Sequence, residues 1–202
     1  MTRIETVDEL RALYAEPKER SVRKQLDRLD IHCRRFIELS PLVVLASVDA
    51  QGWVDASPRG GDPGFVTAED ERTLLLPDRP GNNRLDSLAN IAERPDVGLL
   101  FFVPGIDEML RVNGWAELRS DGELLDRFTT NHRTPRTVLA VHVREAYLHC
   151  AKALMRARLW DPDARIDRRD LPTMGEMLRD QIGPSVSIET QEEMLARYAG
   201  EL

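Results

Sequence analysis

The feature that most constrains the fold is a series of short apolar segments between residues 42 and 143, each bounded by turn-forming residues. The segment 42–48 is followed by a turn at 49–52 and a second segment at 53–58, which is the pattern of a β-hairpin. Further strand-like segments occupy 65–67, 73–76, 97–103, 109–118 and 137–143. Only two short helices interrupt them, at 83–92 and 120–128. Closely spaced strands with few helices favour a mainly β structure with helices (α+β), built on an antiparallel barrel.

Both ends of the chain are typical of helices. Thr6 and Glu9 fit a capping box for a first short helix, and helical periodicity predicts a longer helix over 17–39. Ser120 and Glu123 fit another capping box. The tail is predicted to be helical from Ala146, with later helices ending near 181 and 198. The sequence thus predicts an N-terminal helical extension (1–40), a barrel (41–150) and a C-terminal helical tail (151–202).

Charge and hydropathy argue against several classes of partner. The formal net charge of −7 and pI near 5.2 argue against nucleic-acid binding. No apolar run approaches the ~18 residues that a membrane span needs, and the first residues lack the apolar stretch of a signal peptide. Cys33 and Cys150 each follow a histidine but lack zinc-ligand spacing, so no metal is expected and both are predicted to be buried apolar residues. A cytoplasmic location is expected.

The segment 78–88 carries the strongest functional signal. It follows the apolar run 74–77, contains Pro80, Gly81 and two asparagines, and leads into a helix. Unpaired N–H groups at a helix start favour an anion, and Arg79 and Arg84 flank that start with guanidinium groups suited to phosphate oxygens. The segment predicts a phosphate-bearing ligand. An ordinary strand-to-helix connection, in which the asparagines serve only as turn and cap residues, is the alternative.

Three segments, in this order, resemble the flavin split-barrel proteins of the pyridoxamine 5′-phosphate oxidase family. Residues 54–60 resemble the strand whose backbone lines the flavin, and 75–84 with 90–99 resemble the phosphate segment and the strand after it. Residues 109–117 resemble the strand that reaches the cofactor from a neighbouring subunit. The tail at 149–160 is similar to that of an uncharacterised FMN-dependent subgroup. The resemblance covers about residues 35–182 and implies a split barrel, FMN as cofactor, and a homodimer with FMN at the interface.

The resemblance also implies a set of cofactor-binding residues. The family's phosphate motif usually reads Ser-Arg-Lys, and Asn82-Asn83-Arg84 stands at that place, so one cation is missing. Arg59, Arg79 or Lys152 is expected to compensate. The implied set is Ala56, Ser57, Pro58, Arg59, Leu76, Pro77, Asp78, Asn82, Asn83, Arg84, Arg111, Lys152 and Trp160.

Individual roles within that set have alternatives. Arg59, Arg111 or Lys152 would stabilise the reduced flavin near its N1–C2 edge, whereas Arg111 could instead pair with Glu117 or Asp107 on its sheet. Trp160 would stack on the flavin ring or anchor the tail. No catalytic residue is assigned, because the histidines and the single cysteines stand in no recognisable hydrolase motif.

The resemblance implies an FMN-dependent oxidoreductase that acts on an unknown small molecule. FMN carries the redox chemistry, and the protein binds and tunes it. The alternatives are a flavin-binding sensor or carrier without turnover, a split-barrel reductase that uses deazaflavin F420, and a structural barrel without cofactor. True pyridoxamine 5′-phosphate oxidation is not expected, since the substrate-binding C-terminal segment of that enzyme is not evident.

Overall fold

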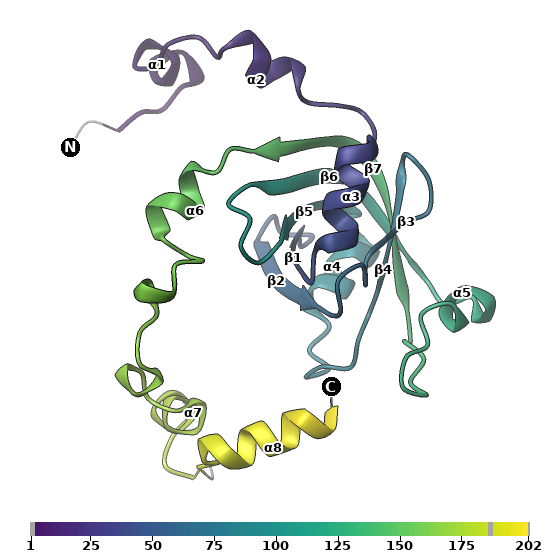
Figure 1. The fold of residues 1–202 in the computed structure, drawn as a ribbon, viewed down its shortest axis with the longest axis vertical. Helices are drawn as coiled ribbons and strands as arrows, with labels where there is room; N and C mark the ends of the chain where they lie inside the picture. Colours follow the sequence, from purple (N-terminus) through teal and green to yellow (C-terminus); the bar gives the residue numbers. More distant parts are fainter. Residues whose placement is uncertain (1–2, 186–187, 202) are drawn as a thin grey trace. The chain divides into compact units, whose positions relative to one another are not determined.

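The computed structural model of the protein describes residues 3–185 and 188–201. Its centre is a seven-stranded sheet in the order β2-β1-β5-β6-β7-β4-β3, in which every neighbouring pair is antiparallel. The strands curl around helix α3 (Figure 1), which confirms the predicted antiparallel split barrel. The strands are β1 (Leu42–Val48), β2 (Val54–Gly60), β3 (Thr67–Ala68), β4 (Thr73–Pro77), β5 (Asp96–Phe102), β6 (Met109–Arg119) and β7 (Val138–His149).

Alternation along the strands divides the sheet into an inner and an outer face. In β1, Val43 and Leu45 are completely buried, whereas Val44 between them is only partly covered, as the two-residue period of a strand requires. The inner residues of five strands join side chains of α3 and α4 in one core cluster. A smaller cluster of Leu75, Phe128, Val138 and Ala140 lies outside the sheet under α5.

The helices of the first unit are shorter than the sequence predicts. They are α1 (Val7–Ala12), α2 (Glu19–Arg23), α3 (Ile31–Leu39), α4 (Asp86–Glu93), α5 (Gly122–Asp126) and α6 (Lys152–Ala157), whose last residues enter the second unit. The Thr6–Glu9 capping box is confirmed. The predicted capping box of Ser120 is wrong, because Asp121 is the N-cap residue of α5 and makes no side-chain cap.

The helix predicted over 17–39 is also wrong, because the chain leaves the helical path between α2 and α3. Leu26 forms an isolated β-bridge with Ala146, through N–H···O contacts of 3.0 and 2.8 Å. The Leu29 N–H donates to the Glu71 carbonyl at 2.8 Å, and Asp30 then caps α3 by accepting from the Cys33 N–H at 2.8 Å. Pairing with distant strands therefore outweighs local helical periodicity.

Strand β7 extends to His149, so the prediction of helix from Ala146 is wrong. The extra residues pair with the first half of the eleven-residue strand β6. A bulge interrupts this ladder between Asn113 and Gly114. A Cβ atom at Gly114 would lie 1.9 Å from the His142 carbonyl oxygen, so the bulge requires glycine at this position.

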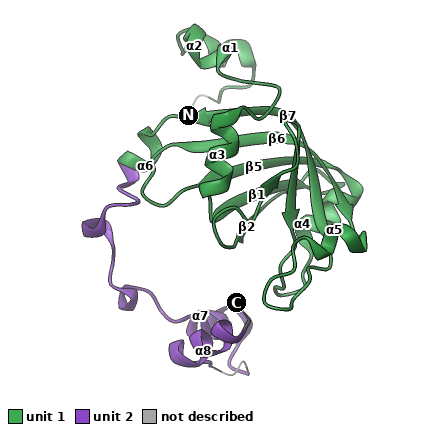
Figure 2. Ribbon diagram, turned by 45° about the vertical axis from the view of Figure 1, so that its right-hand side comes forward, with its two compact units in different colours: residues 1–155 green, residues 156–202 purple. Residues whose placement is uncertain are grey.

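The chain divides into two compact units, Met1–Met155 and Arg156–Leu202 (Figure 2). In the second unit, Thr173 and Glu176 form a capping box at the start of α7, and Gly175 of the same helix lies against the Glu189 backbone. Among the described residues, no helix has the length and apolar character of a membrane span. The elements of this unit are η1 (Pro162–Ala164), η2 (Arg168–Asp170), α7 (Met174–Ile182) and α8 (Gln191–Glu201).

Candidate functional site

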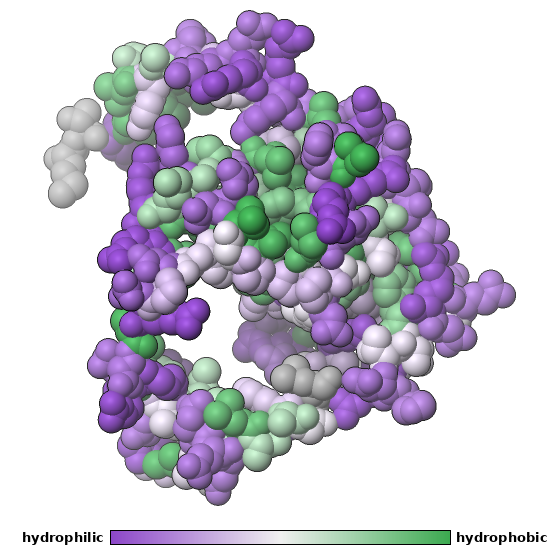
Figure 3. Space-filling model, viewed as in Figure 1, coloured by the Kyte–Doolittle hydropathy of each residue, from purple (hydrophilic) through white to green (hydrophobic). Residues whose placement is uncertain are grey.

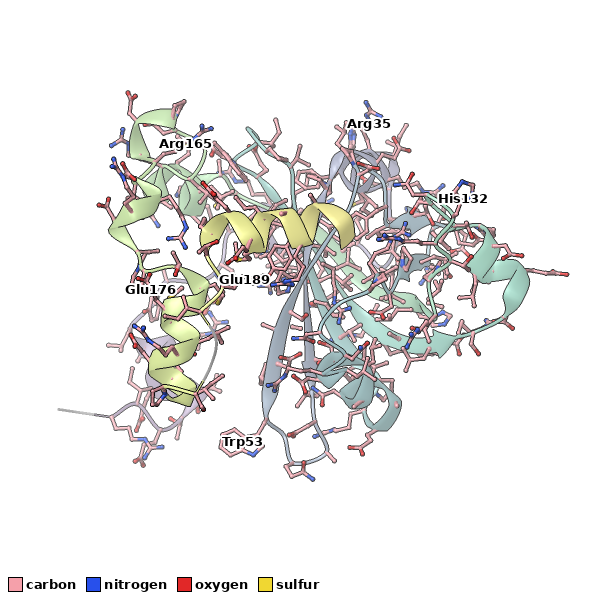
Figure 4. All side chains as sticks on the ribbon, turned by 90° about the horizontal axis from the view of Figure 1, so that it is seen from below. Arg35, Trp53, His132, Arg165, Glu176 and Glu189 are labelled. Carbon is pink, nitrogen blue, oxygen red and sulfur yellow. The ribbon has the colours of Figure 1, made fainter. Side chains whose placement is uncertain are left out.

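Strand β2 stands at one edge of the sheet and presents two different faces. Its inner face carries the polar residues Asp55, Ser57 and Arg59, each partly buried. Its outer face carries Ala56 and Pro58, both exposed. Because β2 has a strand on one side only, the backbone groups that point away from β1 are open to a ligand. At the hairpin tip that precedes β2, the exposed Trp53 points away from the sheet (Figure 4).

An ion pair joins β2 to the segment that follows β4. Arg59 Nη1 lies 2.6 Å from Asp78 Oδ1, and the two side chains are only 21% and 17% exposed. Leu76 and Pro77 are buried in β4, and the Asp78 N–H donates to the Thr137 carbonyl at 2.9 Å. The structure therefore brings the segments 54–60 and 75–78 together through a side-chain contact, although their strands are not neighbours in the sheet.

The loop 79–85 is held in a conformation that non-glycine residues seldom adopt. Asn83 and Leu85 have φ angles of 57° and 59°, in the left-handed region. The Arg84 N–H donates to Asn82 Oδ1 at 3.1 Å, whereas Leu85, the N-cap residue of α4, provides no side-chain cap. Such backbone strain is concentrated at functional sites, and the uncapped helix start leaves N–H donors for an anion.

The two arginines of this loop differ in their availability. Arg79 Nη1 donates to the Phe128 carbonyl at 3.2 Å and to Thr130 Oγ1 at 2.8 Å, so it fastens the loop to the segment after α5. The Arg84 side chain is 73% exposed, and only its Nε has a hydrogen-bond partner in the described chain, Asp86 at 2.8 Å. The hydrogen bond and charge of Asp86 raise the pKa of Arg84. Arg84 can therefore offer two nitrogens to a phosphate.

Helix α4 is fixed beneath β2 and β1 by two polar contacts that the sequence did not reveal. Ser87 Oγ donates to Asp55 Oδ2 at 2.6 Å, and Asn90 Nδ2 donates to Ser47 Oγ at 3.0 Å. Ser47 and Ser87 are both buried. These contacts position the uncapped start of α4 beside the inner face of β2, where Arg84 and Arg59 lie.

Two buried polar atoms in this region lack a hydrogen-bond partner among the described residues. They are Arg59 Nε and Thr137 Oγ1, and both residues contact Asp78 through other atoms. A buried donor without a partner costs about 1–3 kcal/mol, so each such atom calls for an explanation. A bound molecule with acceptor atoms would satisfy both.

Arg111 forms a separate group on the outer face of β6. Its Nη1 donates to the Tyr147 hydroxyl at 3.0 Å, so neither of the ion pairs considered for it, with Glu117 or Asp107, is formed. Arg111 pairs with Leu100 of β5 and lies three strands from Pro58, about 14 Å at the usual strand spacing. Within one chain, Arg111 is therefore not part of the site around Arg84.

The two predicted site residues of the tail lie in different units. Lys152 is the first residue of α6 and is exposed. Trp160 belongs to the second unit, so its role stays a prediction. Cys33 is buried as predicted, but Cys150 is exposed, because it lies just beyond the end of β7.

The model of the pyridoxamine 5′-phosphate oxidase family matches residues 29–150. No curated protein matches the sequence. A HupZ variant from Group A Streptococcus is 17% identical, with a TM-score of 0.50, over 60% of this chain and 99% of that one. A candidate pyridoxamine 5′-phosphate oxidase from Lactobacillus delbrueckii is 23% identical, with a TM-score of 0.48, over 61% of this chain and 98% of that one. An FMN-binding protein from Syntrophomonas wolfei is 14% identical, with a TM-score of 0.45, over 59% of this chain and 90% of that one. The family match spans more than half of the chain, which therefore belongs to the pyridoxamine 5′-phosphate oxidase family.

Proposed function

We propose that the protein is an FMN-binding oxidoreductase that acts on a small molecule in the cytoplasm. The observation that carries the proposal is the loop 79–85, whose strained backbone presents Arg84 and uncapped N–H groups beside the open edge of β2. Family membership supports a flavin at this place. The residues fit the cofactor, since a phosphate needs a cation and N–H donors, and a flavin ring needs backbone partners along its polar edge.

Each part of the site has a distinct role in this proposal. Arg84, Asn82 and Asn83 hold the phosphate, while the backbone of Ala56, Ser57 and Pro58 borders the ring. Bound FMN supplies the redox chemistry. Asp78 keeps Arg59 oriented through their ion pair, and the free Nε of Arg59 is a donor for the cofactor. Leu76 and Pro77 are buried and act by fixing the strand end rather than by contact.

We further propose a homodimer with FMN at the interface. The outer face of the sheet carries uncovered apolar residues, among them Val54 and Trp115, which are 77% and 46% exposed. Figure 3 views the protein from the side on which α3 lies in front of the sheet, so the hydrophobic residues that it shows within a hydrophilic surround are on that side and not on the outer face. A second copy would cover the outer face and could bring its own Arg111, which lies away from the site of its own chain, to the flavin of the first.

A reductase that uses deazaflavin F420 is the second candidate, and one observation favours it. Arg59 and Arg79 are partly buried and each is held by partners within the chain, so Arg84 is the exposed one of these three arginines. One cation suits the singly charged phosphodiester of F420 as well as the phosphate of FMN. A flavin carrier without turnover differs from both candidates, because nicotinamide donors do not reduce its bound flavin.

The first test is the visible spectrum of the purified protein, with identification of any cofactor released by denaturation. FMN in the extract supports the leading proposal, F420 supports the second candidate, and reduction by NADH or NADPH separates an enzyme from a carrier. A colourless protein that also ignores added FMN and F420 contradicts both.

Arg84→Ala tests the site itself. Loss of a charged phosphate contact, about 1.5–3 kcal/mol, weakens FMN binding roughly 10- to 150-fold in a fluorescence-quenching titration. Arg35→Ala is the matched control, because Arg35 is an exposed arginine of α3 that pairs with Glu38 (Figure 4). Riboflavin, which lacks the phosphate, should bind the wild type and Arg84→Ala equally. Unchanged FMN affinity in Arg84→Ala removes this residue from the site.

A further inference from the structure

Four side chains from three segments meet where β6 begins and β7 ends, outside the proposed flavin site of the same chain. Lys24 follows α2, Arg111 lies on β6, and Tyr147 and His149 lie on β7. The Lys24 Nζ and the Arg111 Cζ atoms each lie 5.6 Å from the centre of the Tyr147 ring. The His149 ring centre lies 5.2 Å from the same ring. Tyr147 thus stands between two cations and an imidazole.

The backbone fixes these four residues relative to one another. Arg111 is directly opposite Tyr147 in the β6–β7 register, and Met109 is opposite His149. The β-bridge between Leu26 and Ala146 anchors the segment that carries Lys24 against β7, and the Lys24 ammonium donates to a β7 carbonyl. Three of the four residues therefore lie on paired strands, and Lys24 is held against them, so the cluster is preorganised.

The cluster contains two cations, Lys24 and Arg111. Among residues 3–185 and 188–201, neither Lys24 nor Arg111 forms an ion pair with a carboxylate. Glu145, two residues before Tyr147, faces Gln25 and Asn113 instead and accepts from the Asn113 amide at 2.7 Å. Arg111 is half-buried, and a partly buried cation without an anion is unfavourable.

His149 adds a second, independent indication of a missing partner. Its Nε2 is buried and has no hydrogen-bond partner in the described chain. Burial, and then the charges of Arg111 and Lys24, lower the pKa of His149, so its imidazole is neutral at pH 7 and can donate to an oxygen atom or accept a proton. The cluster therefore offers an ammonium, a guanidinium, a phenol hydroxyl and an imidazole within one region.

We propose that Lys24, Arg111, Tyr147 and His149 form a binding site for a small anion, namely the carboxylate or phosphate group of an organic acid. Lys24 and Arg111 neutralise the acid group, and the Tyr147 hydroxyl and His149 Nε2 hydrogen-bond to its oxygens. The site deepens the proposed function in one respect, since the acid would be the substrate of the flavin. Anion binding itself does not depend on the flavin.

The test is an NMR titration of the histidine side chains in the full-length protein with inorganic phosphate at constant ionic strength. A bound anion raises the pKa of His149, because it offsets the charges of Lys24 and Arg111. The exposed His32 and His132 provide reference signals in the same spectra. Lys24→Met and Arg111→Met should each weaken phosphate binding by about tenfold or more. Lys18→Met, which removes another exposed lysine of the same N-terminal segment, is the control and should change nothing.

A wild-type titration in which phosphate leaves the pKa of His149 unchanged overturns the proposal. So does equal phosphate affinity in Lys24→Met, Lys18→Met and the wild type. Because Lys24 is exposed, its variant should fold normally, and wild-type far-ultraviolet circular dichroism confirms this in each case.

A comparison of FMN with riboflavin identifies the source of the anion and separates this proposal from the preceding one. If FMN but not inorganic phosphate perturbs His149, the cluster holds the cofactor phosphate and the proposed acid site is wrong. If phosphate perturbs His149 but no flavin binds, the anion site stands and the flavoprotein proposal fails.

Discussion

Replacement of Gly114 by alanine should destabilise the barrel strongly, because the β6–β7 bulge leaves no space for a methyl group. The added Cβ would lie 1.9 Å from the His142 carbonyl oxygen, 2.9 Å from the His142 carbonyl carbon and 3.2 Å from the Arg144 nitrogen. These are backbone atoms, so no side-chain rotation relieves the contact. To reach the 3.0 Å below which Cβ contacts are essentially never found, one strand must move by at least 3.0 − 1.9 = 1.1 Å.

Such a movement cannot leave the ladder intact. Overpacking costs about 1–3 kcal/mol, and each strained ladder hydrogen bond adds about 0.5–1.5 kcal/mol. We expect Gly114→Ala to lower the free energy of unfolding by about 3 kcal/mol and the melting temperature by about 6–12 °C. The β6–β7 ladder is the longest of the sheet, so we expect the loss to affect the sheet as a whole.

Urea unfolding followed by circular dichroism measures the effect. The control is Gly122→Ala, at the start of α5, where an added Cβ meets nothing within 4 Å and should be neutral or slightly stabilising. A Gly114→Ala variant within about 1 kcal/mol of the wild type, on the scale of ordinary substitutions, would refute the reasoning that the bulge backbone is rigid.

Three other predictions concern single groups of the first unit. Burial raises the pKa of the Cys33 thiol to about 12, whereas the Cys150 thiol is exposed. At pH 8, Ellman's reagent should therefore react with Cys150 alone in the native chain and with both thiols only after denaturation. Burial, and then the charge of two neighbouring cations, lowers the pKa of His149 in the folded state, so the free energy of unfolding should fall as the pH drops below about 6.5. Urea titrations at pH 7.5 and 5.5 measure this dependence, and the His149→Gln variant should lose it. Asp30→Ala removes the N-cap of α3 and should cost about 1 kcal/mol in the same urea assay, whereas Asp30→Asn should cost little.

The fold was predictable where the pattern of one segment determines its structure. The alternation in β1 and β5 and the turns between strands reflect burial of one sheet face, which any short window of sequence reveals. The break between α2 and α3 and the extension of β7 to His149 were not predictable in this way. Both depend on Leu26 and Ala146 meeting across the chain, and local periodicity contains no information about that pairing.

The candidate site was predictable to a similar degree. The loop around Arg84 was found because proline, glycine and asparagine between a strand and a helix have definite conformational meaning. The contacts Arg59–Asp78 and Ser87–Asp55 join residues 19 and 32 positions apart, and neither spacing follows a periodicity. Their charges and hydroxyls are also common on surfaces, so only the folded sheet distinguishes them from solvated side chains.

The contact between β2 and the end of β4 affects how easily the barrel opens. β2 and β3 are the two edge strands of the sheet. Backbone hydrogen bonds join every neighbouring pair of strands, whereas β2 is linked to Asp78, at the end of β4, by a side-chain ion pair. We therefore expect the barrel to open most easily between β2 and the end of β4. A molecule bound to both β2 and the loop 79–85 acts there as a cross-link, and its binding free energy opposes opening. Amide hydrogen exchange at the edge of the sheet should then slow more on ligand binding than exchange in β5 or β6, which the sheet already protects on both sides.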